Sequence, residues 1–172
     1  MKRLSVKKVA LLGVLTALSL LMFIVESLLS SLVLPGAKIG LSNIFTLLSL
    51  FLLGPIEAII LVVARTVLGS VIVGSLSQLM FSLTAGLVSV IVAIIIYILA
   101  FDKVSIIALS VLSATIHNIV QTAVFCLITM STTYFSLLLY LVPLGIIAGA
   151  LVGVVTQMLI KYIPKSFAEK LL

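Results

Sequence analysis

Ionisable and amide side chains interrupt an otherwise strongly apolar chain, and they are the residues that could do chemistry. Five of them lie inside long apolar segments: Glu26, Arg65, His117, Asn118 and Gln121. A charge at the centre of a bilayer costs roughly 2.5–3.5 kcal/mol or more, so each needs a partner or a function. Arginine presents a planar fork of donors to oxygen acceptors. The set therefore predicts binding of an anionic or strongly hydrogen-bond-accepting ligand.

Three further polar residues stand at the ends of apolar segments. Lys38 lies in a Pro-Gly bend, Asn43 begins the segment that follows it, and Gln78 begins a later one. Arg65 lies about 15 Å along its helix at 1.5 Å per residue. One helical face after residue 104 carries four polar residues spaced three, four and four apart: Ser110, Ser113, His117 and Gln121. We expect a polar pocket that opens outward, walled by the first, second, third and fifth segments, with Lys38 and Asn43 at its mouth.

Each of these residues also has a structural alternative. Arg65 and Glu26 could form an ion pair, His117 could bond to a backbone carbonyl or to Gln121, and Lys38 could extend to the interface. Their joint occurrence at one depth favours a ligand site.

Enzyme chemistry finds no support in the sequence. No P-loop, dinucleotide fingerprint or nucleophile elbow is present. Magnesium-dependent diphosphate chemistry needs clustered carboxylates, and Asp102 is the only aspartate. The single Cys126 excludes an internal disulfide, and a four-ligand metal site lacks its ligands. We expect no catalytic residues, metal or cofactor.

The elements that position these residues are apolar helices. The chain has 172 residues, 64% hydrophobic and 8% charged, with a mean hydropathy of +1.55. A soluble domain could not hide that much apolar surface. Breaks at Pro, Gly and polar clusters leave six segments: 9–33, 40–53, 55–73, 78–100, 104–130 and 136–160. They predict one all-α domain over 1–172, a bundle of six transmembrane helices whose second member is short.

The basic residues cluster at the chain ends. Four of them precede the first segment and three follow the last: Lys2, Arg3, Lys7, Lys8, Lys161, Lys165 and Lys170. Basic residues that flank spans mark the cytoplasmic side, so both termini are predicted to be cytoplasmic. The net charge of +6 therefore indicates the lipid bilayer of a cell membrane, not nucleic acid. The first apolar run is too long for a cleaved signal peptide and is expected to be retained.

Small residues at helical spacing predict close helix packing. Gly145, Gly149 and Gly153 form such a row, and Gly13 and Ala17 form a pair in the first segment. Either set could pack inside the chain or against another protein.

Three stretches carry a family resemblance: PGAKIGLSNI (35–44), AR (64–65) and SATIHNIVQ (113–121). They resemble the heptaprenyl diphosphate synthase component I family, also called the Gx transporter family. The Asp-rich motifs of prenyl chain synthesis are absent, so the resemblance does not imply prenyl synthase activity. In size, six-span pattern and small-residue first helix the chain is similar to the substrate-binding S components of energy-coupling factor (ECF) transporters.

The S-component resemblance implies a substrate site near the outer face. The motifs would contribute Lys38, Asn43, His117, Asn118 and Gln121 to it. Gly13 and Ala17 would dock on the coupling subunit, although glycine here takes the place of the first of two alanines.

The expected function is capture of a small molecule for uptake driven by partner ATPase subunits. Two alternatives remain. The chain could be a membrane subunit of a flavin- or quinone-linked electron-transfer system, or a non-catalytic partner in isoprenoid metabolism.

Overall fold

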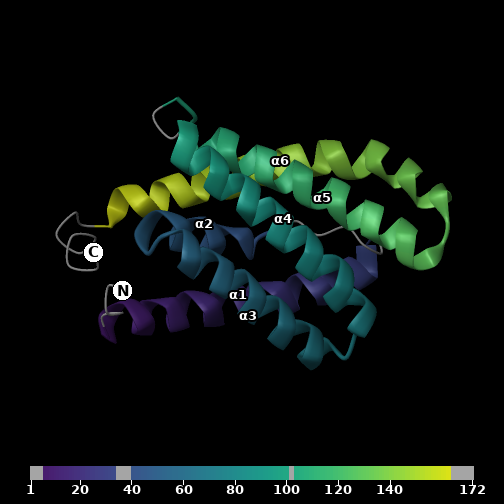
Figure 1. Ribbon diagram of the computed structural model, residues 1–172, viewed down its shortest axis with the longest axis horizontal. Helices are drawn as coiled ribbons and strands as arrows, with labels where there is room; N and C mark the ends of the chain where they lie inside the picture. The colour runs from purple at the N-terminus through teal and green to yellow at the C-terminus, as the bar shows by residue number, and fades with distance from the viewer. Residues whose placement is uncertain (1–5, 34–39, 101–102, 164–172) are drawn as a thin grey trace.

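The chain folds as a bundle of α-helices. The computed structural model describes residues 6–33, 40–100 and 103–163, and all of their side chains except those of 29–33. The elements are α1 Val6–Val33, α2 Asn43–Leu52, α3 Pro55–Val73, α4 Leu76–Ala100, α5 Ile106–Thr129, the 3-10 helix η1 Thr132–Leu137 and α6 Leu138–Tyr162 (Figure 1). No strand occurs within these ranges, so the all-α prediction is confirmed.

Five of the helices are long and apolar enough to cross a membrane: α1, α3, α4, α5 and the stretch from η1 through α6. The chain is thus a multi-pass helical membrane protein. The sixth helix, α2, has ten residues. It extends about 15 Å, half of the ~30 Å hydrocarbon core, so the prediction of six spanning helices was wrong for this one. Its apolar composition suits its position, because six of its residues are buried against neighbouring helices.

The short α2 begins in the middle of the bundle. The Ser19 hydroxyl donates to the Ser42 carbonyl at 3.0 Å, and Ser42 is the residue before α2. Ser19 is the fourteenth of the 28 residues of α1, so the start of α2 is level with the centre of that helix. From there α2 runs toward the end of the bundle where α1 begins (Figure 1). The sequence predicted a start at residue 40, nearer the outer boundary.

Local signals set the other helix boundaries. Gly54 has φ +119° and Pro55 is the first residue of α3, as the predicted Gly-Pro break requires. Gly74 ends α3 in the left-handed conformation. The Ser105 side chain accepts from the Ala108 N–H and so caps α5. The predicted loop after α5 is instead the 3-10 helix η1.

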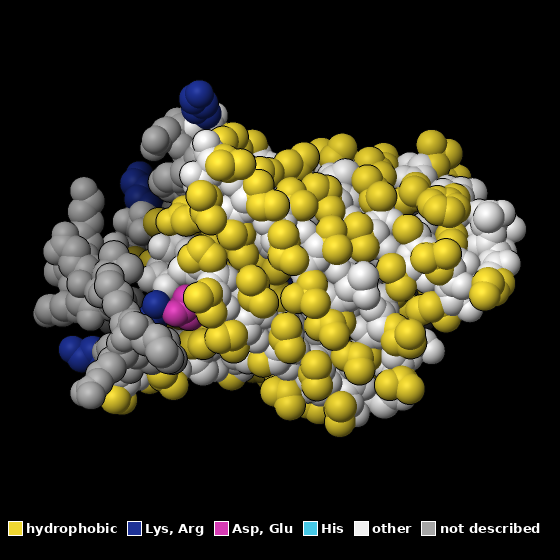
Figure 2. All heavy atoms as spheres, in the orientation of Figure 1, with side chains coloured by type: hydrophobic (Ala, Val, Ile, Leu, Met, Phe, Trp, Pro, Cys, Tyr) yellow, Lys and Arg dark blue, Asp and Glu magenta, His cyan; other side chains and the backbone are white. Residues whose placement is uncertain are grey.

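The start of α1 and the end of α6 lie at the same end of the bundle (Figure 1). On the face shown in Figure 2, the Lys and Arg side chains gather toward this end and hydrophobic side chains cover most of the rest. Lys8 of α1 and Glu57 of α3 form an ion pair of 2.6 Å there. With α1 beginning and α6 ending on one side, the chain traverses the bundle an even number of times, and α2 covers only the last part of one of these traverses. The assignment of this end to the cytoplasm stays a prediction.

The glycine row of α6 packs inside the chain. Helices α5 and α6 make the most extensive interhelical contact in the bundle. A Cβ on Gly149 would lie 2.7 Å from the Val111 Cα, and one on Gly153 would lie 2.7 Å from the Ile107 Cα. The row therefore serves intramolecular packing. Gly13 differs, because a Cβ there would meet nothing within 4 Å.

Candidate functional site

At the start of α2, backbone N–H groups without a helical acceptor lie in the interior of the bundle. Glu26 accepts a hydrogen bond from one of them. One Glu26 carboxylate oxygen accepts the Leu41 N–H, and the other accepts the Ser42 hydroxyl at 3.3 Å. An unsatisfied backbone group at this depth would cost several kcal/mol. The carboxylate also faces the positive end of the α2 dipole. Glu26 thus fastens α1 to the start of α2, which is a structural role.

Arg65 of α3 approaches the same point from another side. Its side chain is 3% exposed. Nη2 donates to the Asn43 Oδ1 at 2.8 Å and Nη1 to the Ser19 hydroxyl at 3.4 Å, and both acceptors are neutral. The buried Nε has no hydrogen-bond partner among the described residues. The guanidinium therefore has donor capacity left for a further acceptor.

A small polar pocket surrounds these groups. We call this cavity the polar pocket. It is lined by Phe23, Glu26, Gly40, Ser42, Asn43, Arg65, Ser82, Ala114, His117, Asn118 and Gly145. Its volume is about 20 Å³, room for a water-sized group. All six α-helices contribute or adjoin the wall, so the prediction of four walls omitted α4 and α6. Packing against α5 brings α6 into the wall at Gly145.

Two consecutive residues of α5 complete the polar pocket. His117 and Asn118 are both buried. The Asn118 Nδ2 donates to the Leu141 carbonyl of α6 at 2.7 Å, which fixes the orientation of the amide. A Cβ on Gly145 would lie 2.7 Å from this nitrogen, so glycine is what allows the amide to fit between the helices.

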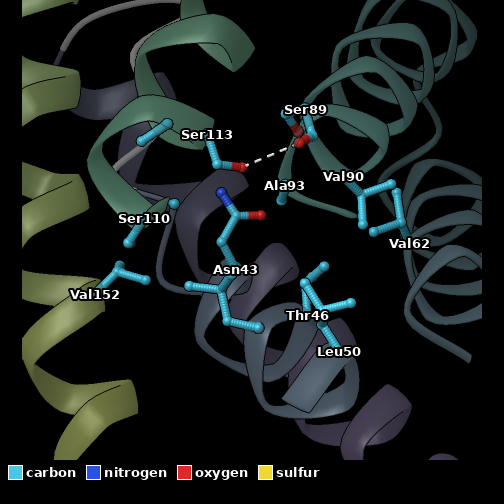
Figure 3. Close-up of a pocket in the computed structure, with 13 residues that line it drawn as sticks. Asn43, Thr46, Leu50, Val62, Ser89, Val90, Ala93, Ser110, Ser113 and Val152 are labelled. Atoms are coloured by element: carbon cyan, nitrogen blue, oxygen red, sulfur yellow. Dashed lines mark hydrogen bonds between the residues drawn. The ribbon is translucent and has the colours of Figure 1, made fainter. Parts of the chain in front are cut away.

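A second small cavity continues the polar pocket along α2. It measures about 20 Å³ and shares Gly40, Asn43 and Ala114 with the polar pocket. Hydroxyl groups of three helices face it, and the Ser113 hydroxyl donates to the Ser89 carbonyl at 3.3 Å (Figure 3). The buried Thr46 hydroxyl has no partner among the described residues. This cavity suits a bound water.

A larger and mainly apolar cavity adjoins the polar pocket on the other side. This apolar chamber has a volume of about 140 Å³ and is lined by Phe81, Asn118, Gln121, Thr122, Phe125, Leu137 and Leu141. Asn118 belongs to both walls. The Phe81 and Phe125 rings meet edge to face with centroids 5.9 Å apart. Phe125 makes a second such contact, at 4.7 Å, with Tyr134 of η1.

Most of the predicted site residues meet at one place. Five line the polar pocket: Glu26, Asn43, Arg65, His117 and Asn118. Gln121 lines the adjoining apolar chamber. Gln78 lies outside the polar pocket, where its Nε2 donates to the Ser27 hydroxyl at 2.8 Å and links α4 to α1. Lys38 lies outside the described residues.

The placement of Asn43 differs from the prediction. It was expected at the pocket mouth, but it lies at mid-depth, because α2 starts level with Ser19. Sequence reasoning also missed Ser42 and Ser82. Serine and threonine occur throughout the apolar segments, so the sequence did not single out these two hydroxyls. The chamber residues Phe81 and Phe125 gave no signal, because apolar residues occur throughout the chain.

The described residues of this site do not form a set of metal ligands. The described parts of the chain contain no group of three His, Cys, Asp or Glu side chains able to hold a metal ion. The donors present suit hydrogen bonding to an organic ligand.

The fold and the pocket together define a class, a multi-pass helical membrane protein with a polar pocket at the centre of its bundle. Within that class the chain belongs to the heptaprenyl diphosphate synthase component I family, whose family model matches residues 15–159. The match includes Glu26, Asn43, Arg65 and the polar face of α5. No curated protein matches the chain, and no solved structure does.

Proposed function

We propose that this chain is the substrate-binding component of a transporter, similar to an ECF S component, and captures a small molecule from the outer face of the cell membrane. The observation that carries the proposal is Arg65, a buried arginine at the centre of the bundle with an Nε that no described residue accepts from. A buried charge is expensive, and its retention in a pocket favours a ligand role.

The electrostatics of the polar pocket favour a ligand that accepts hydrogen bonds and carries negative charge. The negative charge of Glu26 faces the partial positive charge at the start of α2. The Arg65 guanidinium is bonded to neutral oxygens of Asn43 and Ser19. Glu26 lines the same pocket and its charge acts on Arg65 as well, but the Arg65 Nε is left for an acceptor group of the ligand, such as a carboxylate.

Energy for uptake would come from a partner. The sequence has no P-loop, so ATP hydrolysis is assigned to separate ATPase subunits joined through a coupling subunit. The chain itself is proposed to be non-enzymatic and to bind without a cofactor.

The proposed docking surface is the exposed face of α1 that holds Gly13 and Ala17. Both residues are exposed, and a Cβ on Gly13 would meet nothing within 4 Å. The glycines of α6 already pack against α5. The pair on α1 is therefore the small-residue motif that remains accessible to a partner helix. Lipid contacts do not require small residues, whereas a closely approaching helix does.

Affinity purification from native membranes in mild detergent tests this assignment. The wild type should retain a membrane coupling subunit with its ATPases, and Gly13→Leu should lose them. Thr84→Leu is the matched control, because it places the same side chain on an exposed position of α4. Docking on α1 would be supported if Thr84→Leu retained the coupling subunit and Gly13→Leu lost it.

Three outcomes would contradict the proposal. Flavin- or quinone-linked proteins in the eluate would indicate an electron-transfer subunit, and a prenyl synthase would indicate a role in isoprenoid metabolism. Equal recovery of the coupling subunit with wild type and Gly13→Leu would overturn the docking surface.

A further inference from the structure

We infer that the ligand has two parts, a compact anionic group bound at Arg65 and a flat apolar ring of about six members held in the apolar chamber. The inference rests on the proposed role of the polar pocket as a substrate site. It adds the chemical class of the substrate, which the function proposed above leaves open.

The sizes of the two cavities separate the two parts of the ligand. The polar pocket has room for about 20 Å³, which suits a single substituent and excludes a ring. The chamber offers about 140 Å³. An apolar protein cavity of roughly 150 Å³ stays dry and accepts benzene, so this chamber has the capacity for one six-membered ring.

The chamber walls suit an aromatic or similarly flat occupant. Phe81 and Phe125 line it from α4 and α5, with their rings edge to face. Phe125 is held in turn by Tyr134, so its ring is positioned from both sides. Aromatic rings add favourable edge-to-face contacts to the burial of a flat apolar group. Leu137 of η1 and Leu141 of α6 add apolar surface to the wall.

Asn118 lies between the two cavities and is the one wall residue that they share, so it sets the geometry of the ligand. Its side chain lines both walls, and its Nδ2 is held by the Leu141 carbonyl at 2.7 Å. A ligand that fills both cavities passes this amide, so its anionic group must be attached directly to the ring or through a short linker. A long flexible chain would not match two adjoining cavities of these sizes.

The chamber lies toward the end of the bundle opposite the start of α1. Phe81 is near the beginning of α4, Phe125 is near the end of α5, and Leu137 ends η1. These ends of α4 and α5 lie together in Figure 1. The predicted orientation makes this the outer side, so a ligand that arrives from outside would leave its ring nearest the entrance.

Binding of benzoate and acetate to the purified protein in detergent micelles tests the two-part ligand. Both probes carry the same carboxylate, and benzoate adds the ring, so calorimetric titration measures the contribution of the chamber. We expect benzoate to bind at least tenfold more tightly than acetate. Arg65→Gln should weaken both probes at least tenfold.

Leu137→Trp fills the chamber from η1, and Leu139→Trp is the matched control at an exposed position. The benzoate preference should fall below threefold in Leu137→Trp and persist in Leu139→Trp. The chain has no natural tryptophan, so the emission of the new residue reports whether its ring is buried. Phe125→Ala provides a second test, because a larger chamber should shift the preference from benzoate to 2-naphthoate.

Several results would overturn the inference. In the wild type, these are equal binding of benzoate and acetate, or no binding of either. In the variants, they are a benzoate preference that persists in Leu137→Trp although the new ring is buried, or no gain for 2-naphthoate in Phe125→Ala. These failures are distinct from failure of the transporter assignment. Co-purification of a coupling subunit without ring-selective binding would remove the two-part ligand alone, and ring-selective binding without a coupling subunit would remove the transporter role alone.

Discussion

Replacement of Gly149 by alanine should destabilise the bundle, and the geometry gives the size of the effect. The new Cβ would lie 2.7 Å from the Val111 Cα, 3.0 Å from the Ala114 Cβ and 3.1 Å from the Ser110 carbonyl oxygen. Carbon atoms prefer separations of about 3.5–4.0 Å, so α5 and α6 must move apart by roughly 1 Å. Two of the obstructing atoms belong to the backbone of α5 and cannot turn away.

The cost of the overpacked contact exceeds the gain in helix propensity. Overpacking a close contact costs about 1–3 kcal/mol, while Gly→Ala in a helix gains up to about 1 kcal/mol. We therefore expect Gly149→Ala to lower the free energy of unfolding by about 1–2 kcal/mol. Gly13→Ala is the control, because it makes the same change in α1 with nothing within 4 Å of the new methyl group. That variant should be as stable as the wild type or more stable.

Denaturant-induced unfolding in detergent micelles, followed by far-ultraviolet circular dichroism, measures both changes. A Gly149→Ala protein that unfolds at the wild-type midpoint would refute the packing of α6 on α5 described here. Equal loss of stability in Gly13→Ala would refute it as well, because the effect would then be a general response to glycine replacement. Since the contact lies beside Ser110 and Ala114, we also expect Gly149→Ala to weaken benzoate binding.

The other polar contacts give three further predictions. Glu26→Ala should lower the free energy of unfolding by about 1–3 kcal/mol because the partly buried Leu41 N–H loses its acceptor, and Glu26→Gln should lower it less because an acceptor remains. Thermal unfolding of the two variants side by side would decide this. Removing one partner of the Lys8–Glu57 ion pair should lower the free energy of unfolding by more than the about 0.2–1 kcal/mol typical of exposed pairs, because the Glu57 side chain is only 9% exposed. A double-mutant cycle with a coupling energy inside that range would contradict this estimate. Gln78→Ala should lower the free energy of unfolding by about 0.5–1.5 kcal/mol, because the hydrogen bond to Ser27 is lost. Benzoate affinity should stay unchanged. A tenfold weaker affinity would place Gln78 in the binding site.

The sequence by itself determined the class of the fold and most of the polar cluster. Continuous apolar segments leave no choice but membrane helices, because every backbone polar group in lipid must be satisfied within the segment. The cost of burying polar groups likewise identified Glu26, Arg65, His117 and Asn118, all of which line the polar pocket. The spacing of polar residues on α5 was sufficient to place them on one interior face.

Only the tertiary structure decided where α2 begins and what the glycine rows contact. Composition cannot distinguish a short spanning helix from one that starts at mid-depth, because the deciding contacts of Ser42 with Ser19 and Glu26 come from another helix. A small-residue row likewise predicts a close approach without naming the partner, and α6 meets α5 while the Gly13 face of α1 is exposed. The apolar chamber was invisible in the sequence for the same reason. Its walls consist of residues common throughout the chain, and only their packing leaves a space between them.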